Sequence, residues 1–163
     1  MLGFMGHVQY VRFVDLAEPF HLGKKTMTQA NNDNEELRQQ IQAQLVELQR
    51  LWPIGNTDRL AAELFSERIE VCGEGAPSAT VGADAFREVL GAMISDTPAV
   101  EVSLVKCARL GEEAALTWLI WKAVDRLGTV LPPMRSLTVW ENDGGWKIRA
   151  DMYTAGQFYE SNS

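Results

Sequence analysis

The order in which helix-like and strand-like hydrophobic patterns follow one another limits most strongly what this chain can fold into. From residue 35 to residue 94, apolar residues recur mostly every three or four positions, as they do along one face of a helix. After residue 100 the chain consists of strand-like runs separated by turn residues. Helices gathered early and strands gathered late predict an α+β fold with the helices on one face of the sheet.

This pattern predicts three helices and five strands. The first helix is expected at residues 35–52, because Leu37, Ile41 and Leu45 share one helical face. Residues 142–145, with the sequence Asn-Asp-Gly-Gly, tolerate positive φ and predict a tight hairpin turn. The other expected elements are a short helix from residue 57, a strand at 68–73, a helix at 82–94, and strands at 100–109, 114–125, 134–141 and 146–153.

We divide the chain into an N-terminal extension of residues 1–32, one domain of residues 33–160 and a short tail of residues 161–163. A length of 163 residues, 46% of them apolar, suits a single domain with its own core. Residues 1–26 lack the basic start and the cleavage site of a signal peptide. Two interpretations of them stay open, a non-native or misassigned leader ahead of Met27 and an additional strand.

Composition excludes several classes of function. A formal net charge of −7 argues against nucleic-acid binding, which needs a basic face. No apolar run approaches the roughly 18 residues that span a bilayer, so we expect no membrane partner. Two cysteines do not make a disulfide framework, and we expect a cytoplasmic protein.

Histidine is missing from the predicted domain, because His7 and His21 both precede it. Without histidine the domain has no Ser-His or Cys-His nucleophilic pair. Cys72 and Cys107 alone are too few to hold zinc. We therefore expect chemistry that uses neither a metal ion nor a cofactor.

Three stretches carry a resemblance to a known superfamily. Residues 58–67, Asp-Arg-Leu-Ala-Ala-Glu-Leu-Phe-Ser-Glu, look like a second helix running into a first strand. Residues 81–86 are similar to the glycine-led start of a third helix, and residues 139–153 resemble a closing hairpin. Together with the order of elements, they resemble the ketosteroid isomerase and nuclear transport factor 2-like superfamily, and its SnoaL-like members in particular. The resemblance implies a curved, mostly antiparallel sheet wrapped around about three N-terminal helices and enclosing an apolar cavity.

The resemblance also implies a catalytic role for Asp151 on the last strand. This residue matches an aspartate that acts as acid or base in limonene epoxide hydrolase and SnoaL-like cyclases, and loss of hydration in an apolar cavity raises the pKa of a carboxyl group. Strand alternation places Arg149, Asp151 and Tyr153 on one face, toward the cavity, with Tyr153 or Arg149 as a polar helper. The alternative is a structural Asp151 whose pKa is lowered by an ion pair with Arg149 or Arg135.

The same alternation predicts an apolar outer face on the last strand. Such a face suggests that two copies of the chain pair through the outer side of the sheet as a homodimer. The residues expected there are Trp146, Ile148, Ala150 and Met152.

Eight residues are expected to bind a substrate in the cavity. Arg135 is included because, if the closing hairpin carries a bulge, an inward arginine would suit a carboxylate-bearing ligand. Glu74 lies near the position of the ketosteroid isomerase base. Leu119 and Trp121 stand where the epoxide hydrolases have an arginine and a second aspartate, so that mechanism does not transfer whole. The full set is Trp121, Leu119, Met93, Leu90, Trp52, Val71, Arg135 and Glu74.

Two functions follow as hypotheses. The first is a cofactor-independent enzyme of the isomerase, cyclase, dehydratase or hydrolase type, which acts on a small hydrophobic molecule with Asp151 as general acid or base. The second is a non-catalytic module of the same fold that binds a small ligand or serves as a dimeric scaffold. The first hypothesis is favoured only by analogy with the fold, since one fold hosts many functions.

Overall fold

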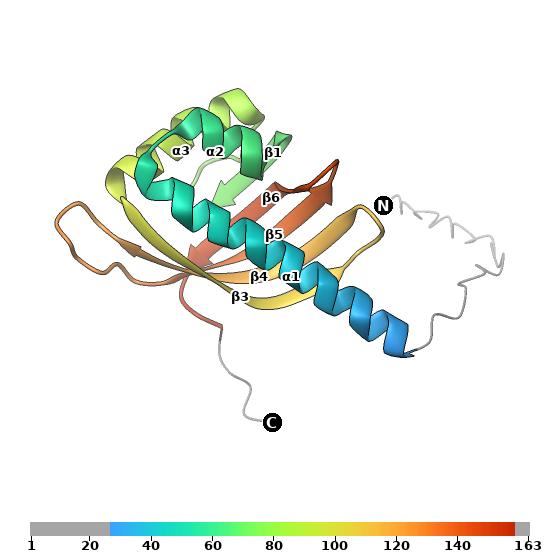
Figure 1. Ribbon diagram of the computed structural model, residues 1–163. Coiled ribbons are helices and arrows are strands. Elements are labelled where there is room, and N and C mark those ends of the chain that lie inside the picture. Colours follow the sequence, from blue (N-terminus) through green and yellow to red (C-terminus); the bar gives the residue numbers. More distant parts are fainter. Residues whose placement is uncertain (1–26, 159–163) are drawn as a thin grey trace, which may run out of the picture.

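The computed structural model of the chain describes residues 27–158 (Figure 1), so both interpretations of residues 1–26 and the predicted tail at 161–163 lie outside the described residues. The described part contains three α-helices, one 3₁₀ turn and a six-stranded sheet. In chain order the elements are α1 (Met27–Leu51), the 3₁₀ turn η1 (Trp52–Ile54), α2 (Thr57–Leu64), β1 (Phe65–Gly73), β2 (Thr80–Val81), α3 (Ala83–Asp96), β3 (Ala99–Arg109), β4 (Ala114–Val124), β5 (Met134–Asn142) and β6 (Trp146–Ala155).

The sheet has the strand order β2-β1-β6-β5-β4-β3. Strands β3 to β6 form an antiparallel meander, and β1 runs parallel to β6 at the other side of the meander. The prediction of an α+β fold with a mostly antiparallel sheet is confirmed. The short strand β2 was not predicted, because its two residues follow a loop rich in glycine and proline that gives no strand pattern.

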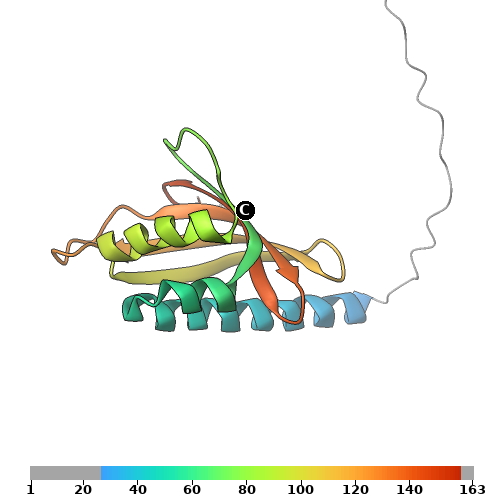
Figure 2. The same cartoon turned by 90° about the horizontal axis from the view of Figure 1, so that it is seen from above.

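Helix α1 lies along one side of the molecule, with the sheet behind it (Figures 1 and 2). It packs mainly across β3, and Leu37, Ile41 and Leu45 are fully buried in that contact layer. The helix begins at Met27, so the domain boundary predicted at residue 33 falls inside it. No helix of the described part is both long and apolar enough to cross a membrane.

A β-bulge in β6 changes which side chains of this strand face the helices. The register pairs Trp140 with Ile148 but Val139 with Ala150, so Arg149 is the extra residue. Trp146 and Ile148 are therefore buried in the core, on the same side as Asp151. The predicted alternation, which placed Trp146 and Ile148 on the outer face, was wrong because a bulge breaks the period of two.

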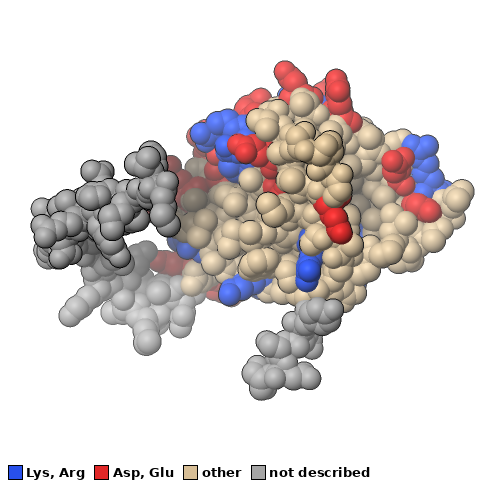
Figure 3. Space-filling view, turned by 180° about the vertical axis from the view of Figure 1, so that it is seen from behind, with Lys and Arg blue, Asp and Glu red and all other residues tan. Residues whose placement is uncertain are grey.

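The outer face of the sheet is apolar across its middle strands. Trp118, Leu137 and Met152 are successive register partners on β4, β5 and β6, and Met152 is 62% exposed. The view from behind shows a broad area with few charged side chains (Figure 3). After β6 the chain brings Phe158 edge-on against Trp118, with ring centroids 5.2 Å apart.

Candidate functional site

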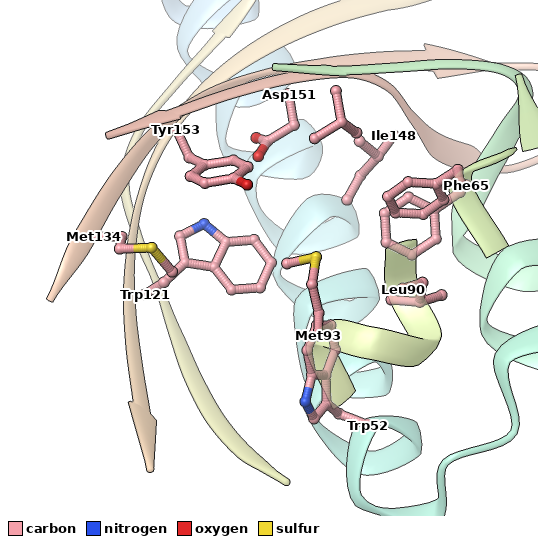
Figure 4. A pocket seen from close by; sticks show the side chains of 11 residues that line it. Trp52, Phe65, Leu90, Met93, Trp121, Met134, Ile148, Asp151 and Tyr153 are labelled. Atoms are coloured by element: carbon pink, nitrogen blue, oxygen red, sulfur yellow. The ribbon is translucent and has the colours of Figure 1, made fainter. Parts of the chain in front are cut away.

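An apolar pocket lies between the helices and the inner face of the sheet (Figure 4). Its residues come from η1, α3 and the strands β1, β4, β5 and β6, and Asp151 carries the only carboxyl group among them. The cavity volume is about 40 Å³, which is room for roughly three water molecules. The lining residues are Trp52, Phe65, Val71, Phe86, Leu90, Met93, Trp121, Met134, Ile148, Asp151 and Tyr153.

Asp151 points into this pocket from β6 (Figure 4). Its side chain keeps partial accessibility because it faces the cavity, yet protein atoms replace most of its hydration. No lysine or arginine of the described residues forms an ion pair with it. Desolvation therefore dominates and raises the pKa of Asp151 from 3.8 to about 6, although hydrogen bonds from the Thr138 and Ser136 hydroxyl groups oppose the rise.

Two hydroxyl groups connect the carboxyl group of Asp151 to Trp121 in the pocket wall. Thr138 Oγ1 donates to Asp151 Oδ1 at 2.5 Å and lies 3.1 Å from Ser136 Oγ. The indole Nε1 of Trp121 donates to Ser136 Oγ at 2.9 Å. Thr138 and Ser136 are both buried, since they face inward from β5 next to Asp151 and Tyr153 in the register.

Asp151 Oδ2 and the Tyr153 hydroxyl group are the two polar groups left open to the pocket. The bond from Thr138 goes to Oδ1 and not to Oδ2, and no hydrogen bond reaches the Tyr153 hydroxyl group from the described residues. Neither Oδ2 nor the Tyr153 hydroxyl group belongs to the fully enclosed polar atoms without a partner. The Tyr153 ring lies against Gly73, where an added Cβ would be 2.1 Å from Tyr153 Cζ. Glycine at position 73 therefore makes room for the ring that carries this hydroxyl group.

Seven of the predicted site residues line the pocket. Their positions follow from the inward faces of the strands and from the helical face of α3. They are Trp52, Val71, Leu90, Met93, Trp121, Asp151 and Tyr153.

Four predicted residues lie elsewhere. Arg149 is the bulge residue of β6 and reaches Glu70 Oε1 at 3.0 Å, so it does not assist Asp151. Arg135 faces the outer side of β5, where it donates to the Gln157 carbonyl group at 3.2 Å and lies over the Phe158 ring. Leu119 faces inward but is fully buried in the core beside the pocket.

Glu74, also predicted to bind substrate, lies outside the pocket lining. Its carboxylate accepts hydrogen bonds from Thr154 Oγ1 at 2.6 Å and from the Ala155 amide at 2.8 Å. These two bonds hold the pKa of Glu74 below its usual value. Glu74 thus links the end of β1 to the end of β6 and has no contact with the pocket.

Sequence reasoning missed Ser136 and Thr138, which alternate with Leu137 and Val139 on β5. The alternation is visible in the sequence, but without the register it does not show which of the two faces of the strand points inward. Counting back from the 142–145 turn pairs Thr138 with Asp151 only if the bulge at Arg149 is included. Among residues 27–158, no three His, Cys, Asp or Glu side chains lie close enough together to hold a metal ion.

Comparison with known proteins shows similarity in structure only. No model of a protein family matches the chain, and no curated protein does. A ketosteroid isomerase-like protein from Erwinia carotovora atroseptica superposes with a TM-score of 0.61 at 17% identity, over 77% of this chain and 99% of that one. A nuclear transport factor 2-like superfamily protein from Salmonella enterica superposes with a TM-score of 0.57 at 19% identity, over 82% of this chain and 97% of that one.

A domain with a cystatin-like fold from Nostoc punctiforme is similar as well. It superposes with a TM-score of 0.57 at 16% identity, over 82% of this chain and 81% of that one. At such low identity a similarity in structure speaks for the fold and leaves the function open. The chain therefore adopts the α+β cone fold of ketosteroid isomerase-like and nuclear transport factor 2-like proteins, as the sequence predicted.

Proposed function

We propose that this protein is an enzyme that moves a proton on a small hydrophobic molecule, with Asp151 as general acid or base and without a cofactor. The observation that carries the proposal is a carboxyl group in an apolar pocket without a cationic partner. Burial raises the pKa of Asp151 to about 6. A group with a pKa near the working pH is the most effective proton carrier, because both of its forms are populated.

The two open polar groups suit complementary roles. Asp151 Oδ2 takes a proton from a carbon atom next to a carbonyl group of the substrate and returns it elsewhere on the molecule. The Tyr153 hydroxyl group donates a hydrogen bond to the oxygen atom on which negative charge develops. One proton carrier and one donor favour isomerisation or dehydration over hydrolysis, which needs space and a second group to orient water.

The size of the cavity restricts the substrate. About 40 Å³ is well below the several hundred Å³ typical of ligand sites, so the pocket has to widen before a substrate binds. Met93 and Met134 lie in the wall, and methionine side chains adapt to new shapes at low cost. A compact, uncharged molecule with one carbonyl or hydroxyl oxygen fits these limits.

Exchange of hydrogen for deuterium tests the proposal without knowledge of the natural substrate. Small cyclic ketones and enones are incubated with the protein in D₂O, and loss of the proton signal next to the carbonyl group is followed by NMR. We expect exchange that grows faster as the pH rises through about 6, since only the ionised Asp151 accepts a proton. Asp151→Asn is expected to slow exchange by about 10² to 10⁴ and Tyr153→Phe by a smaller factor. Exchange at the same rate with wild type and Asp151→Asn would overturn the proposal.

A non-catalytic role is the second candidate, and the small cavity is the observation that favours it. In that case the pocket is filled by a molecule that co-purifies with the protein, or by one of the cyclic ketones and enones tested. The bound molecule then exchanges no hydrogen for deuterium. Measuring both binding and hydrogen–deuterium exchange on the same ketones and enones therefore distinguishes the two functions.

We also propose that the protein forms a homodimer through the outer face of the sheet. The row of Trp118, Leu137 and Met152 supports this, because an exposed apolar strip of this kind usually marks an interface. Two-fold pairing of identical faces is the commonest form of assembly in soluble proteins.

A further inference from the structure

The hydrogen-bonded path from Trp121 to Asp151 has a direction that the chemistry of its members determines. An indole N–H group can only donate, and an ionised carboxylate can only accept. Between them stand Ser136 and Thr138, each with one hydroxyl proton to give. Trp121 Nε1 donates to Ser136 Oγ, and Thr138 Oγ1 donates to Asp151 Oδ1. The contact of 3.1 Å between the two hydroxyl oxygens is then a donation from Ser136 to Thr138.

Reversal of this path is unfavourable. If Asp151 carried a proton on Oδ1 and donated it to Thr138, Thr138 would have to donate to Ser136. Ser136 already accepts from Trp121, so its own proton would be left with the Asp151 carboxyl group as its acceptor, and both hydroxyl groups would have to turn together. The short donation from Thr138 to Asp151 would be lost in the process.

We infer that Thr138 and Ser136 are positioning residues that keep Asp151 Oδ1 as a hydrogen-bond acceptor, so that the proton Asp151 takes up resides on Oδ2, the oxygen open to the pocket. The inference rests on the proposed acid/base role of Asp151 and specifies which atom performs it. Oδ2 takes no part in the hydrogen bond from Thr138 and is not a fully enclosed atom without a partner. A proton held there can be passed directly to a bound molecule.

The residues around Asp151 allow the effect of the Thr138 and Ser136 hydroxyl groups on its pKa to be measured. The side chains that line the pocket with Asp151 come from η1, α3, β1, β4, β5 and β6, and apart from Tyr153 none of them titrates. The Tyr153 phenol on β6 is the other titratable group of the pocket. With no charge nearby, removing a hydroxyl donor changes the pKa of Asp151 through the lost hydrogen bond.

The test is an NMR titration of the full chain with ¹³C-labelled aspartate carboxyl groups, with the Asp151 signal assigned by its loss in Asp151→Asn. Thr138→Val keeps the shape of the side chain and removes the donor, so we expect the pKa of Asp151 to rise by about one further unit. Thr138→Ser restores the donor and should return the pKa to the wild-type value. Ser136→Ala is expected to raise the pKa by less, because Thr138 still donates to Oδ1.

Thr117→Val is the matched control. Thr117 is as buried as Thr138 and is its register partner on β4, but its hydroxyl group accepts from Trp140 Nε1 and is not bonded to Asp151. We expect no change in the pKa of Asp151 in this variant. The inference is overturned if Thr138→Val leaves the pKa unchanged, or if Thr117→Val shifts it equally.

Failure of the inference and failure of the proposed function give different results. A wild-type pKa of Asp151 near 4 contradicts the acid/base role itself. A wild-type pKa near 6 that does not respond to Thr138→Val contradicts only the positioning role. If Thr138→Val does not fold, Ser136→Ala decides, since an unchanged pKa in that variant also overturns the inference.

Discussion

At the scale of single residues, Asp151 gives the protein an unusual dependence of stability on pH. Its folded pKa of about 6 lies above the unfolded value of 3.8, so the folded state binds the proton more tightly. Stability from this group is then greatest below pH 3.8 and is lost as the pH rises to about 6. A shift of this size corresponds to a loss of about 3 kcal/mol.

Asp151→Asn should therefore stabilise the protein at pH 8, by up to about 3 kcal/mol, because the amide has no charge to desolvate. At pH 4 the gain should nearly vanish, since wild-type Asp151 is then protonated in the folded state. Urea denaturation at the two pH values measures the difference in the free energy of unfolding between wild type and Asp151→Asn. Contributions from other titrating groups are common to both proteins and cancel. An equal difference at pH 4 and pH 8 would show that the pKa of Asp151 is not raised.

Asp125→Asn is a control of opposite sign. The carboxylate of Asp125 accepts hydrogen bonds from the backbone amides of Thr129 and Leu127, chiefly the former, and these lower its pKa below 3.8. Its contribution to stability is present above pH 3.8 and is lost as the pH falls below that value. Asp125→Asn should therefore be less stable than wild type at pH 8, and the difference in the free energy of unfolding should become smaller as the pH falls below 3.8.

At the scale of elements, the parallel pairing of β1 with β6 depends on a close approach at their ends. Gly73 and Tyr153 are register partners, and the Tyr153 ring occupies the space that a side chain at position 73 would need. Gly73→Ala should push the ring out of place, with a loss of about 1–3 kcal/mol in the free energy of unfolding. The measurements are urea denaturation and the NMR shifts of the Tyr153 ring.

Two further variants test whether the Tyr153 ring is the reason that Gly73→Ala destabilises the protein. Gly91→Ala lies inside α3, where the nearest atom to the new Cβ is Thr57 Cγ2 at 3.7 Å, so it should stabilise the protein by up to about 1 kcal/mol. Combining Gly73→Ala with Tyr153→Leu should cost less than the sum of the two single changes, because the leucine leaves room for the new methyl group. Additive effects would mean that the ring and the glycine do not interact.

How far the sequence predicts this structure also depends on the element. The long helices were predictable because a stripe such as Leu37, Ile41 and Leu45 repeats the helical period several times. For β6, only the side-chain directions after Arg149 could be predicted. Arg149 is an inserted residue that reverses the direction of every side chain before it in the strand, and such a bulge has no local sequence signal. The inward positions of Ser136 and Thr138 depend on the same register, so this part of the site could not be derived.

At the scale of the whole molecule, the sheet is covered by helices on one face and apolar on the other. The homodimer was predicted from Trp146, Ile148, Ala150 and Met152, of which the bulge leaves only the last two outside. The outer faces of β4 and β5 extend the apolar surface instead, through Trp118 and Leu137. The proposed interface therefore stands on different residues from those that first suggested it.

A charge within the apolar row of this face should separate the two copies. Met152→Glu places a carboxylate beside Leu137, and burying it against a second copy is costly without a cationic partner. We expect wild type to have the mass of a dimer by light scattering at micromolar concentration and Met152→Glu to have that of a monomer. Val46→Glu, at a side chain of α1 that is 55% exposed, adds the same charge elsewhere and should remain dimeric. A monomeric wild type, or a dimeric Met152→Glu, would contradict the interface, because Met152 is 62% exposed and pairs with Leu137 in the apolar row.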